Sequence, residues 1–170
     1  MKDQPEVWLR GPVAGIPPLL QPVAHSLLQS LEEVERHVTG LTSAQIWTKP
    51  GGAASVGFHV RHAAGSLDRL FTYARGEQLT PGQMALLRGE TLEDDALDSG
   101  GLAAGFMTAV DRALDQLRTA DQSRLLEARG VGRAQLPSTV LGLLFHAAEH
   151  TQRHIGQMVT TRAAVISGIR

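Results

Sequence analysis

Three histidines, His146, His150 and His154, follow one another at intervals of four residues near the end of the chain. On a helix this spacing places side chains on one face, and at about 100° per residue the three spread over only about 80°. Imidazole nitrogens bind divalent metal ions, with Zn–N distances of about 2.0–2.1 Å. The first and third histidines lie two turns apart, about 12 Å along the axis. We therefore expect one neighbouring pair to bind an ion, either His146 with His150 or His150 with His154.

Two ligands from one helix make a weak site, so this interpretation needs a third ligand from another helix. His62 is the best supplier, because it falls at the edge of the apolar arc of a predicted helix. His59 lies three residues earlier on that helix and is the reserve. The alternative is a plain helical bundle with structural histidines, since a single histidine is more often a satisfied or half-exposed residue than a ligand.

Residues 146–150 also spell H-x-x-E-H, the motif of the inverted zincin peptidases, in which the glutamate (here Glu149) activates water. Those peptidases take a glutamate ligand from further downstream, whereas residues 151–170 contain no Asp or Glu. The chain is also too short for such a mixed α/β enzyme, so we interpret the match as accidental. The sequence contains no G-x-S-x-G motif, no phosphate-binding loop and no dinucleotide fingerprint.

The elements that must position these histidines are helices. Ser55 and Ser138 are expected to cap the second and the fourth of them. Four amphipathic helices bury their apolar faces most simply as a four-helix bundle, so the predicted fold class is all-α. Apolar periodicity predicts the helices over residues 19–38, 55–75, 102–117 and 138–164.

The remaining segments are predicted to be irregular. Residues 1–17, rich in Gly and Pro, form an N-terminal arm outside a bundle domain of residues 18–165. The acidic 77–98 segment is predicted to lack regular structure. Residues 131–136 alternate weakly between apolar and polar, and we predict a loop there.

Composition excludes several classes of function. The net charge of −1 gives no electrostatic footprint for nucleic acid or for an anionic membrane. The chain has no cysteine, which rules out disulfides and thiolate metal sites. It shows neither an apolar signal core at its start nor an apolar run long enough to span a membrane, so we expect a cytoplasmic protein. Helical bundles of this size often pair, which makes a homodimer the expected assembly.

Two stretches resemble the DinB-like (YfiT-like) superfamily of metal-binding four-helix bundles. Residues 55–62, Ser-Val-Gly-Phe-His-Val-Arg-His, are similar to its S-[IV]-x-x-x-x-x-H motif at the start of the second helix. Residues 150–157, His-Thr-Gln-Arg-His-Ile-Gly-Gln, are similar to its H-x-x-x-H-x-G-Q motif on the last helix. The order and separation of the two motifs also agree, and the resemblance covers about residues 18–165.

Carried over residue by residue, the resemblance implies that His62, His150 and His154 are the metal ligands. It leaves His59 and His146 as residues that line the pocket or support the ligands. Gln157 matches the glutamine of the family motif and is expected to have a similar role.

The family includes thiol-dependent S-transferases and maleylpyruvate isomerases, which use a low-molecular-weight thiol such as mycothiol or bacillithiol. The resemblance therefore implies a small-molecule substrate and a divalent ion, Zn, Ni or Fe. Three neutral imidazoles leave coordination positions open, and such an ion can lower the pKa of a bound water or thiol. We expect a metal-dependent enzyme of the thiol S-transferase or hydrolase type. The alternative is a non-catalytic bundle or interaction protein, in which the ion only pins two helices.

Four residues are candidates for further roles in such an enzyme. His146 or Glu149 could carry protons, which makes them the catalytic candidates. Arg69 or Arg153 could hold an anionic group of the substrate. Each arginine has an ordinary explanation too, since Arg69 could pair with a carboxylate in the fold and Arg153 could be a solvated surface residue.

Overall fold

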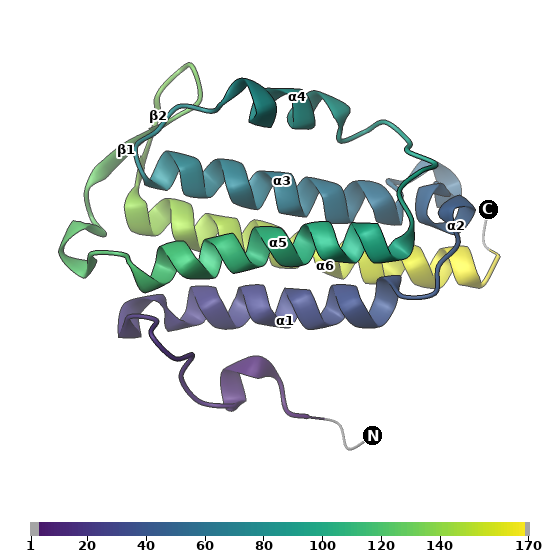
Figure 1. Cartoon of the computed structure of the whole chain (residues 1–170), viewed down its shortest axis with the longest axis horizontal. Helices are drawn as coiled ribbons and strands as arrows, with labels where there is room; N and C mark the ends of the chain where they lie inside the picture. Colours follow the sequence, from purple (N-terminus) through teal and green to yellow (C-terminus); the bar gives the residue numbers. More distant parts are fainter. Residues whose placement is uncertain (1–3, 169–170) are drawn as a thin grey trace.

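The computed structural model describes residues 4–168, and its main body is an antiparallel bundle of long helices (Figure 1). The helix α1 and the helix α3 each pack against both α5 and α6. The prediction of an all-α bundle is confirmed. The helices that build the bundle are α1 (Gln21–Val38), α3 (Val56–Ala74), α5 (Ser99–Arg118) and α6 (Val140–Ile166).

The core forms where the apolar stripes of these helices meet. Its largest fully buried side chains come from every long helix, for example Leu27 of α1, Leu67 of α3, Phe106 of α5 and Ile155 of α6. Burying one such side chain is worth about 1.5–3 kcal/mol, so the stripes fix how each helix is rotated about its axis. That rotation decides which polar residues lie at the edges of the core.

The helix starts follow capping chemistry. Ser55 caps α3, as predicted, by accepting a hydrogen bond from the backbone N–H of Phe58. The cap of α6 differs from the prediction: Thr139, rather than Ser138, accepts from the backbone N–H of Gly142. The correction has a simple cause: the short β-ladder runs on to Thr139, which pairs with Ala128, so the first helical residue is Val140 and the residue before it is the cap.

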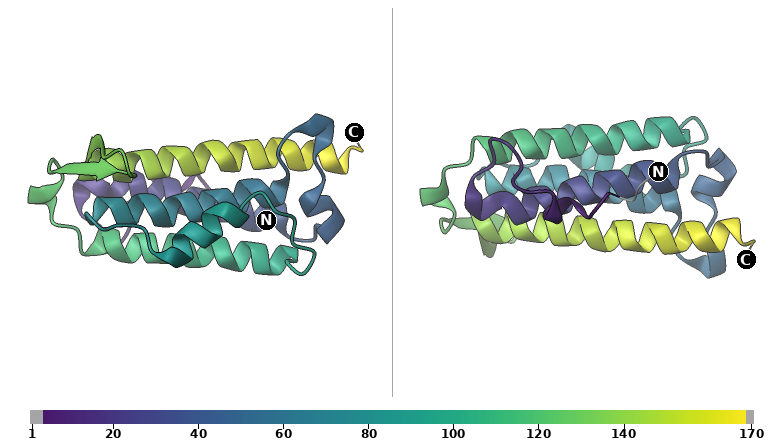
Figure 2. Two further views of the ribbon diagram at one scale, coloured as in Figure 1. Left: turned by 90° about the horizontal axis from the view of Figure 1, so that it is seen from above. Right: turned by 90° about the horizontal axis from the view of Figure 1, so that it is seen from below.

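Two further predictions for the connecting segments are wrong. The segment from 77 to 98 contains the helix α4 (Pro81–Gly89), which begins with a capping box of Thr80 and Gln83 and a proline at its first position. Figure 2 shows that α4 lies on the outside of the bundle. No residue of α4 is buried, which explains why apolar periodicity did not reveal it.

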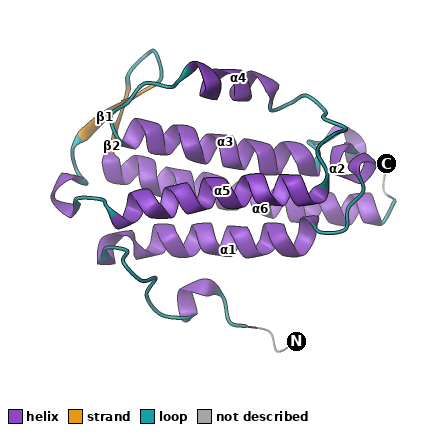
Figure 3. Ribbon diagram, viewed as in Figure 1, coloured by secondary structure: helices purple, strands orange, loops and turns teal. Residues whose placement is uncertain are grey.

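The second correction is a β-hairpin in the connection between α5 and α6: residues 132–135, within the predicted loop, form its turn, and the strands on either side were not predicted (Figure 3). The strands β1 (Ala128–Val131) and β2 (Leu136–Thr139) pair antiparallel, with Val131 opposite Leu136. The hairpin lies at the end of the bundle where α3 ends and α6 begins. Its strands have four residues each, too few for alternation to stand out in the sequence.

Short elements complete the chain. The N-terminal arm lies along α1, with Val7 and Ile16 buried against the bundle. It contains the 3-10 turns η1 (Val7–Leu9) and η2 (Pro18–Leu20), and the connection between α1 and α3 contains α2 (Ser43–Trp47) and η3 (Pro50–Gly52). Over the described range, 4–168, none of the helices combines the length and the apolar character that crossing a membrane requires.

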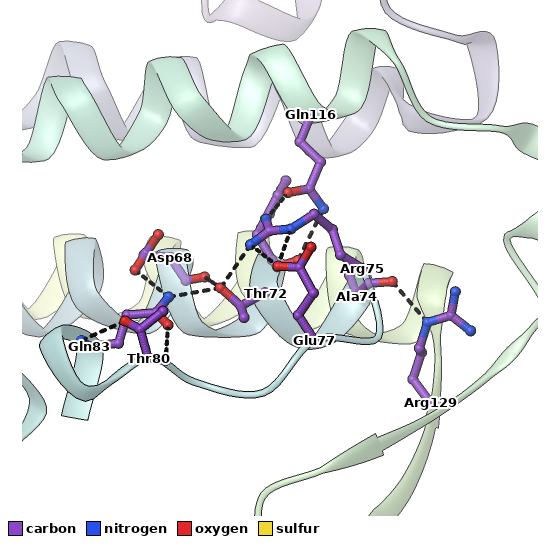
Figure 4. A network of polar contacts seen from close by, with 10 residues as sticks. Asp68, Thr72, Ala74, Arg75, Glu77, Thr80, Gln83, Gln116 and Arg129 are labelled. Carbon is purple, nitrogen blue, oxygen red and sulfur yellow. Dashed lines mark hydrogen bonds and ion pairs between the residues drawn. The ribbon is translucent and has the colours of Figure 1, made fainter.

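A polar network fastens α4 to α3 (Figure 4). The side-chain amide of Gln83 donates to Asp68 at 2.6 Å and to the hydroxyl of Thr72 at 2.8 Å. At the other end of α4, the guanidinium of Arg61 donates to the backbone carbonyls of Gly89 and Leu92. Contacts at both ends therefore hold α4 in place over α3, although its own side chains bury little surface.

Candidate metal centre

The packing of α3 against α6 brings three of the predicted residues together. His62 of α3 and His150 and His154 of α6 each offer a ring nitrogen, and these nitrogens lie within 4.8 Å of one another. The Nε2 atoms of His62 and His150 are 3.0 Å apart. In tetrahedral zinc coordination, neighbouring nitrogens are separated by about 3.3 Å, so small side-chain rotations would let all three reach one ion.

The choice between the two histidine pairs on α6 is decided by this geometry. His146 lies one turn before His150 and is half exposed, with its Nδ1 3.3 Å from the carboxylate of Glu149. The ring centroids of His150 and His154 are 4.6 Å apart, and that of His62 lies 4.5 Å from His154. The compact cluster therefore contains His150 and His154, and His146 stands outside it.

A buried carboxylate supports the cluster and was missed by the sequence analysis. Glu90, the residue that ends α4, is 4% exposed, and its Oε2 lies 2.8 Å from Nδ1 of His62. Its other oxygen accepts a hydrogen bond from Arg69 of α3, which is also buried. Burial alone raises the pKa of the Glu90 carboxyl, but the contacts with His62 and Arg69 outweigh it and bring the pKa below its ordinary value. Glu90 is therefore ionised and accepts the Nδ1 proton of His62.

This contact selects the tautomer of His62. Because Nδ1–H donates to a carboxylate, the lone pair is left on Nε2, the atom that faces His150. Histidines that bind metals commonly donate their other ring N–H to a carboxylate or a carbonyl in this way. Glu90 and Arg69 thus orient His62 as a candidate ligand, and Arg69 is the ion-pair partner of a buried carboxylate in the fold.

Two aromatic neighbours enclose the cluster from the side of α3. His59 is 6% exposed, and its Nδ1 lies 3.1 Å from Nδ1 of His154. When His154 is the donor in this contact, its Nε2 has the free lone pair. Phe58 stacks on His62, with ring centroids 5.3 Å apart and an angle of 13° between the planes. Both residues restrict the rotation of the candidate ligands.

The electrostatics favour the neutral form of His150 and His154. Burial, together with the neighbouring histidines, lowers the pKa of His154 to about 4. The pKa of His150 is lowered mainly by burial, with smaller contributions from His62 and Arg153. Burial also lowers the pKa of His59. At neutral pH these rings carry lone pairs rather than a second proton, which is the form that binds a metal ion.

One polar contact must change when an ion enters. Arg153 lies 3.3 Å from Nδ1 of His150 and donates to it, so the Nε2–H of that ring points at Nε2 of His62. Binding through Nε2 requires the opposite tautomer of His150, and Arg153 then has to release Nδ1. Arg153 has a second partner, the carboxylate of Glu149 at 3.0 Å, and its half-exposed side chain can rest there.

A pocket of about 670 Å³ opens beside the cluster. His154 and His59 form part of its wall, together with Phe58, Arg153 and Gln157. Gly156 also lies in the lining, and a Cβ atom placed there would meet nothing within 4 Å. The pocket is therefore open next to the candidate ligands. His146 and Glu149, the predicted proton carriers, are not among the residues of its wall.

The comparisons with known proteins agree with this architecture. The DinB superfamily matches residues 26–158. The crystal structure of a conserved protein from Enterococcus faecalis superposes with a TM-score of 0.71 at 20% identity, covering 87% of this chain and 97% of that one.

A DinB-like protein from Bacillus cereus ATCC 10987 superposes with a TM-score of 0.59 at 15% identity, covering 85% of this chain and 92% of that one. A comparison with curated proteins gave no significant match. Because the family match spans most of the chain and includes both helices that carry the histidine cluster, this protein belongs to the DinB superfamily.

Proposed function

We propose that the protein is a metal-dependent enzyme of the thiol S-transferase or hydrolase type, in which His62, His150 and His154 hold one divalent ion. The observation that carries the proposal is a three-histidine cluster of which one member, His154, lines an open pocket. A Zn, Ni or Fe ion in such a site supplies a Lewis acid that lowers the pKa of a water or a thiol.

The protein's own residues would hold and orient this centre. Glu90 keeps the Nδ1 proton on His62 and presents Nε2. His59 contacts Nδ1 of His154, and with His154 as the donor the lone pair of that ring is likewise left on Nε2. The low pKa of His154 keeps that ring neutral down to about pH 4, so protons compete with the ion only in acid.

The pocket supports a catalytic role over the non-catalytic alternative. An ion that only pinned α3 to α6 would need no open space beside it, whereas here a pocket of about 670 Å³ reaches His154. That volume is within the range of small-molecule sites. Arg153, the one formally charged side chain among the described residues of its wall, would favour a substrate with an anionic group. A low-molecular-weight thiol is the substrate class that we propose.

Three sequence predictions stay predictions. His146 and Glu149 as proton carriers require a substrate that extends beyond the pocket wall to reach them. A homodimer and a cytoplasmic location likewise rest on the sequence alone.

The proposal is tested first by metal content. Protein purified without a histidine tag and supplied with zinc should hold about one ion per chain. His150→Ala and His154→Ala should abolish this binding, and His146→Ala, the matched change one turn earlier, should leave it nearly unchanged. Loss of the ion in His146→Ala but not in His154→Ala would show that the ligand set is wrong.

The second test concerns catalysis. The metal-loaded protein is assayed with several low-molecular-weight thiols and electrophiles, with the His154→Ala variant as the metal-free control. A rate gain confined to the loaded wild-type protein would support an enzyme. Normal metal binding without any rate gain would favour the metal-stabilised, non-catalytic bundle.

A further inference from the structure

A second cleft lies on the other side of Glu90, between α4 and α5. Its volume is about 280 Å³, and it shares no lining residue with the pocket beside His154. Its wall is largely apolar and includes Val60 and Ala64 of α3 and Phe106 of α5. The cleft meets the metal centre described above only at Glu90, whose carboxylate oxygens are taken by His62 and Arg69.

At Gly105 the open space of the cleft depends on the absence of a side chain from α5. Gly101 and Gly105 both line it, one turn apart on α5. A Cβ atom at Gly105 would meet nothing within 4 Å, so this side of the helix borders open space rather than packed atoms. Glycine inside a helix is unfavourable by about 0.5–1 kcal/mol relative to alanine. The space at Gly105 is therefore left open, although a larger side chain would fit there.

The side of the cleft formed by α4 is apolar but little buried. Leu86 of α4 belongs to the lining but is 63% exposed, and no side chain of α4 is buried. Leucine at this position gains little from the protein as it stands, and it would bury more surface against an apolar molecule lying between α4 and α5. The cleft thus has apolar surface on both sides.

The charges of the lining indicate what kind of molecule fits. Arg61 donates to backbone carbonyls, Asp68 accepts from Gln83, and Glu90 is held by His62 and Arg69. Arg112 is different: within residues 4–168 it takes part in no hydrogen bond or ion pair of the structure, although it lines the cleft. Arg112 is therefore the lining residue whose charged donors are free to take a ligand, while Asp68 keeps its negative charge with a neutral partner.

We propose that the cleft between α4 and α5 is a second binding site, which takes a compact apolar carboxylate with its acid group on Arg112. An apolar cavity of about 150 Å³ holds one benzene ring, so the volume here suits two fused rings or an equivalent branched chain. The ligand's apolar body lies between Leu86 and the wall of α5, and the carboxylate pairs with the guanidinium at the rim.

The probe for the test is 2-naphthoate, an acid with two fused rings. It is titrated into the full chain and followed by backbone amide NMR, in the presence of a chelator so that no metal ion can hold the acid. We expect saturable binding with the largest shifts at Gly101 and Gly105. Absence of saturation, or shifts centred on His154, would overturn the proposal. Because the chelator removes any ion, the result does not depend on whether the three-histidine site is an enzyme centre.

Two variants make the test specific. Gly105→Leu fills the cleft and should weaken binding at least about tenfold, the loss expected when the equivalent of two methylene groups stays in water. Ala104→Leu adds a similar side chain to the neighbouring exposed position and should leave binding unchanged. Equal affinities of these two variants would refute the location. Thermal melting checks that Gly105→Leu still folds.

The charge is tested with the neutral amide of the same shape, 2-naphthamide. The wild-type protein should bind the acid about two- to fivefold more tightly than the amide, the range of an exposed ion pair. Arg112→Gln should remove this preference while leaving affinity for the amide unchanged. A preference for the acid that survives in Arg112→Gln would show that another group holds the carboxylate.

Discussion

Replacing Glu90 by glutamine should weaken metal binding although this residue does not touch the ion. Glu90 has one oxygen on Nδ1 of His62 and the other on the guanidinium of Arg69. Glutamine has the same shape but only one oxygen. The buried guanidinium carries a full charge and should take that oxygen, which turns the amide NH2 toward His62.

An NH2 group facing Nδ1 reverses the tautomer of His62. Nδ1 then accepts, and the hydrogen moves to Nε2, the atom that must bind the ion. Changes to hydrogen-bond partners of metal-binding histidines lower metal affinity about 10–100-fold, which corresponds to about 1.4–2.7 kcal/mol. We expect Glu90→Gln to fall in this range. Glu90→Ala is the less informative change, since it strands a buried Arg69 and is expected to destabilise the fold by about 3–5 kcal/mol.

The affinity is measured by competition with a chromophoric chelator at neutral pH. Nitrogen-15 NMR of the imidazoles in metal-free protein reports the tautomer of His62 separately. Glu93→Gln is the matched control: it lies three residues further along, and its exposed carboxylate pairs with Lys49 at the surface, so both readouts should stay at wild-type values. If Glu90→Gln kept both the wild-type tautomer and the wild-type affinity, the assigned role of Glu90 would be wrong.

Two further predictions concern stability. A glycine-to-alanine change normally stabilises the middle of a helix, but the Cβ of Gly65→Ala would lie 2.7 Å from Nη1 of Arg69 and against the carboxylate of Glu90. We therefore expect the free energy of unfolding, measured with urea, to fall by about 1–3 kcal/mol. Gly100→Ala is the control and should not destabilise the protein, because its Cβ would have 3.5 Å of clearance. The pKa of His154 falls from 6.5 to about 4 on folding, so the unfolded chain binds more protons between these values and the unfolding free energy should drop as the pH falls. Allowing for its partial exposure, metal-free protein should lose about 1–2 kcal/mol between about pH 7.5 and pH 5, and His154→Asn should flatten this dependence. A pH profile that is identical in the variant would contradict the assigned pKa.

The bundle was predictable from the sequence because its helices are long and strongly periodic. The apolar stripe of each helix, to which Leu27, Leu67 and Ile155 belong on α1, α3 and α6, indicates both that a helix forms and which face it buries. The ends were less predictable, as the shift of the cap from Ser138 to Thr139 shows: either side chain can accept the first N–H, and the β-ladder, which ends at Thr139, decided between them. Pairing between segments is not visible in local periodicity.

The same distinction explains the candidate site. His150 and His154 lie on one face of one helix, and His62 lies at the core edge of its own helix, so helical spacing and the apolar pattern were enough to name them as candidates. Spacing alone left His146 as an equal partner of His150. The motif resemblance removed it, and the packing of α3 against α6 then placed His62 beside His150 and His154.

Glu90 could not have been found by these means. It stands 28 residues after His62 at the end of a helix without buried side chains, and no periodic pattern relates the two positions. One signal was present in Gly65, a glycine inside a strongly predicted helix, where alanine would be preferred unless something has to approach the backbone closely. The approaching groups are the paired side chains of Arg69 and Glu90. The 77–98 segment, for which periodicity predicted no structure, therefore supplies the carboxylate that orients His62. The sequence signal for this contact was Gly65 of α3 rather than any residue of the segment itself.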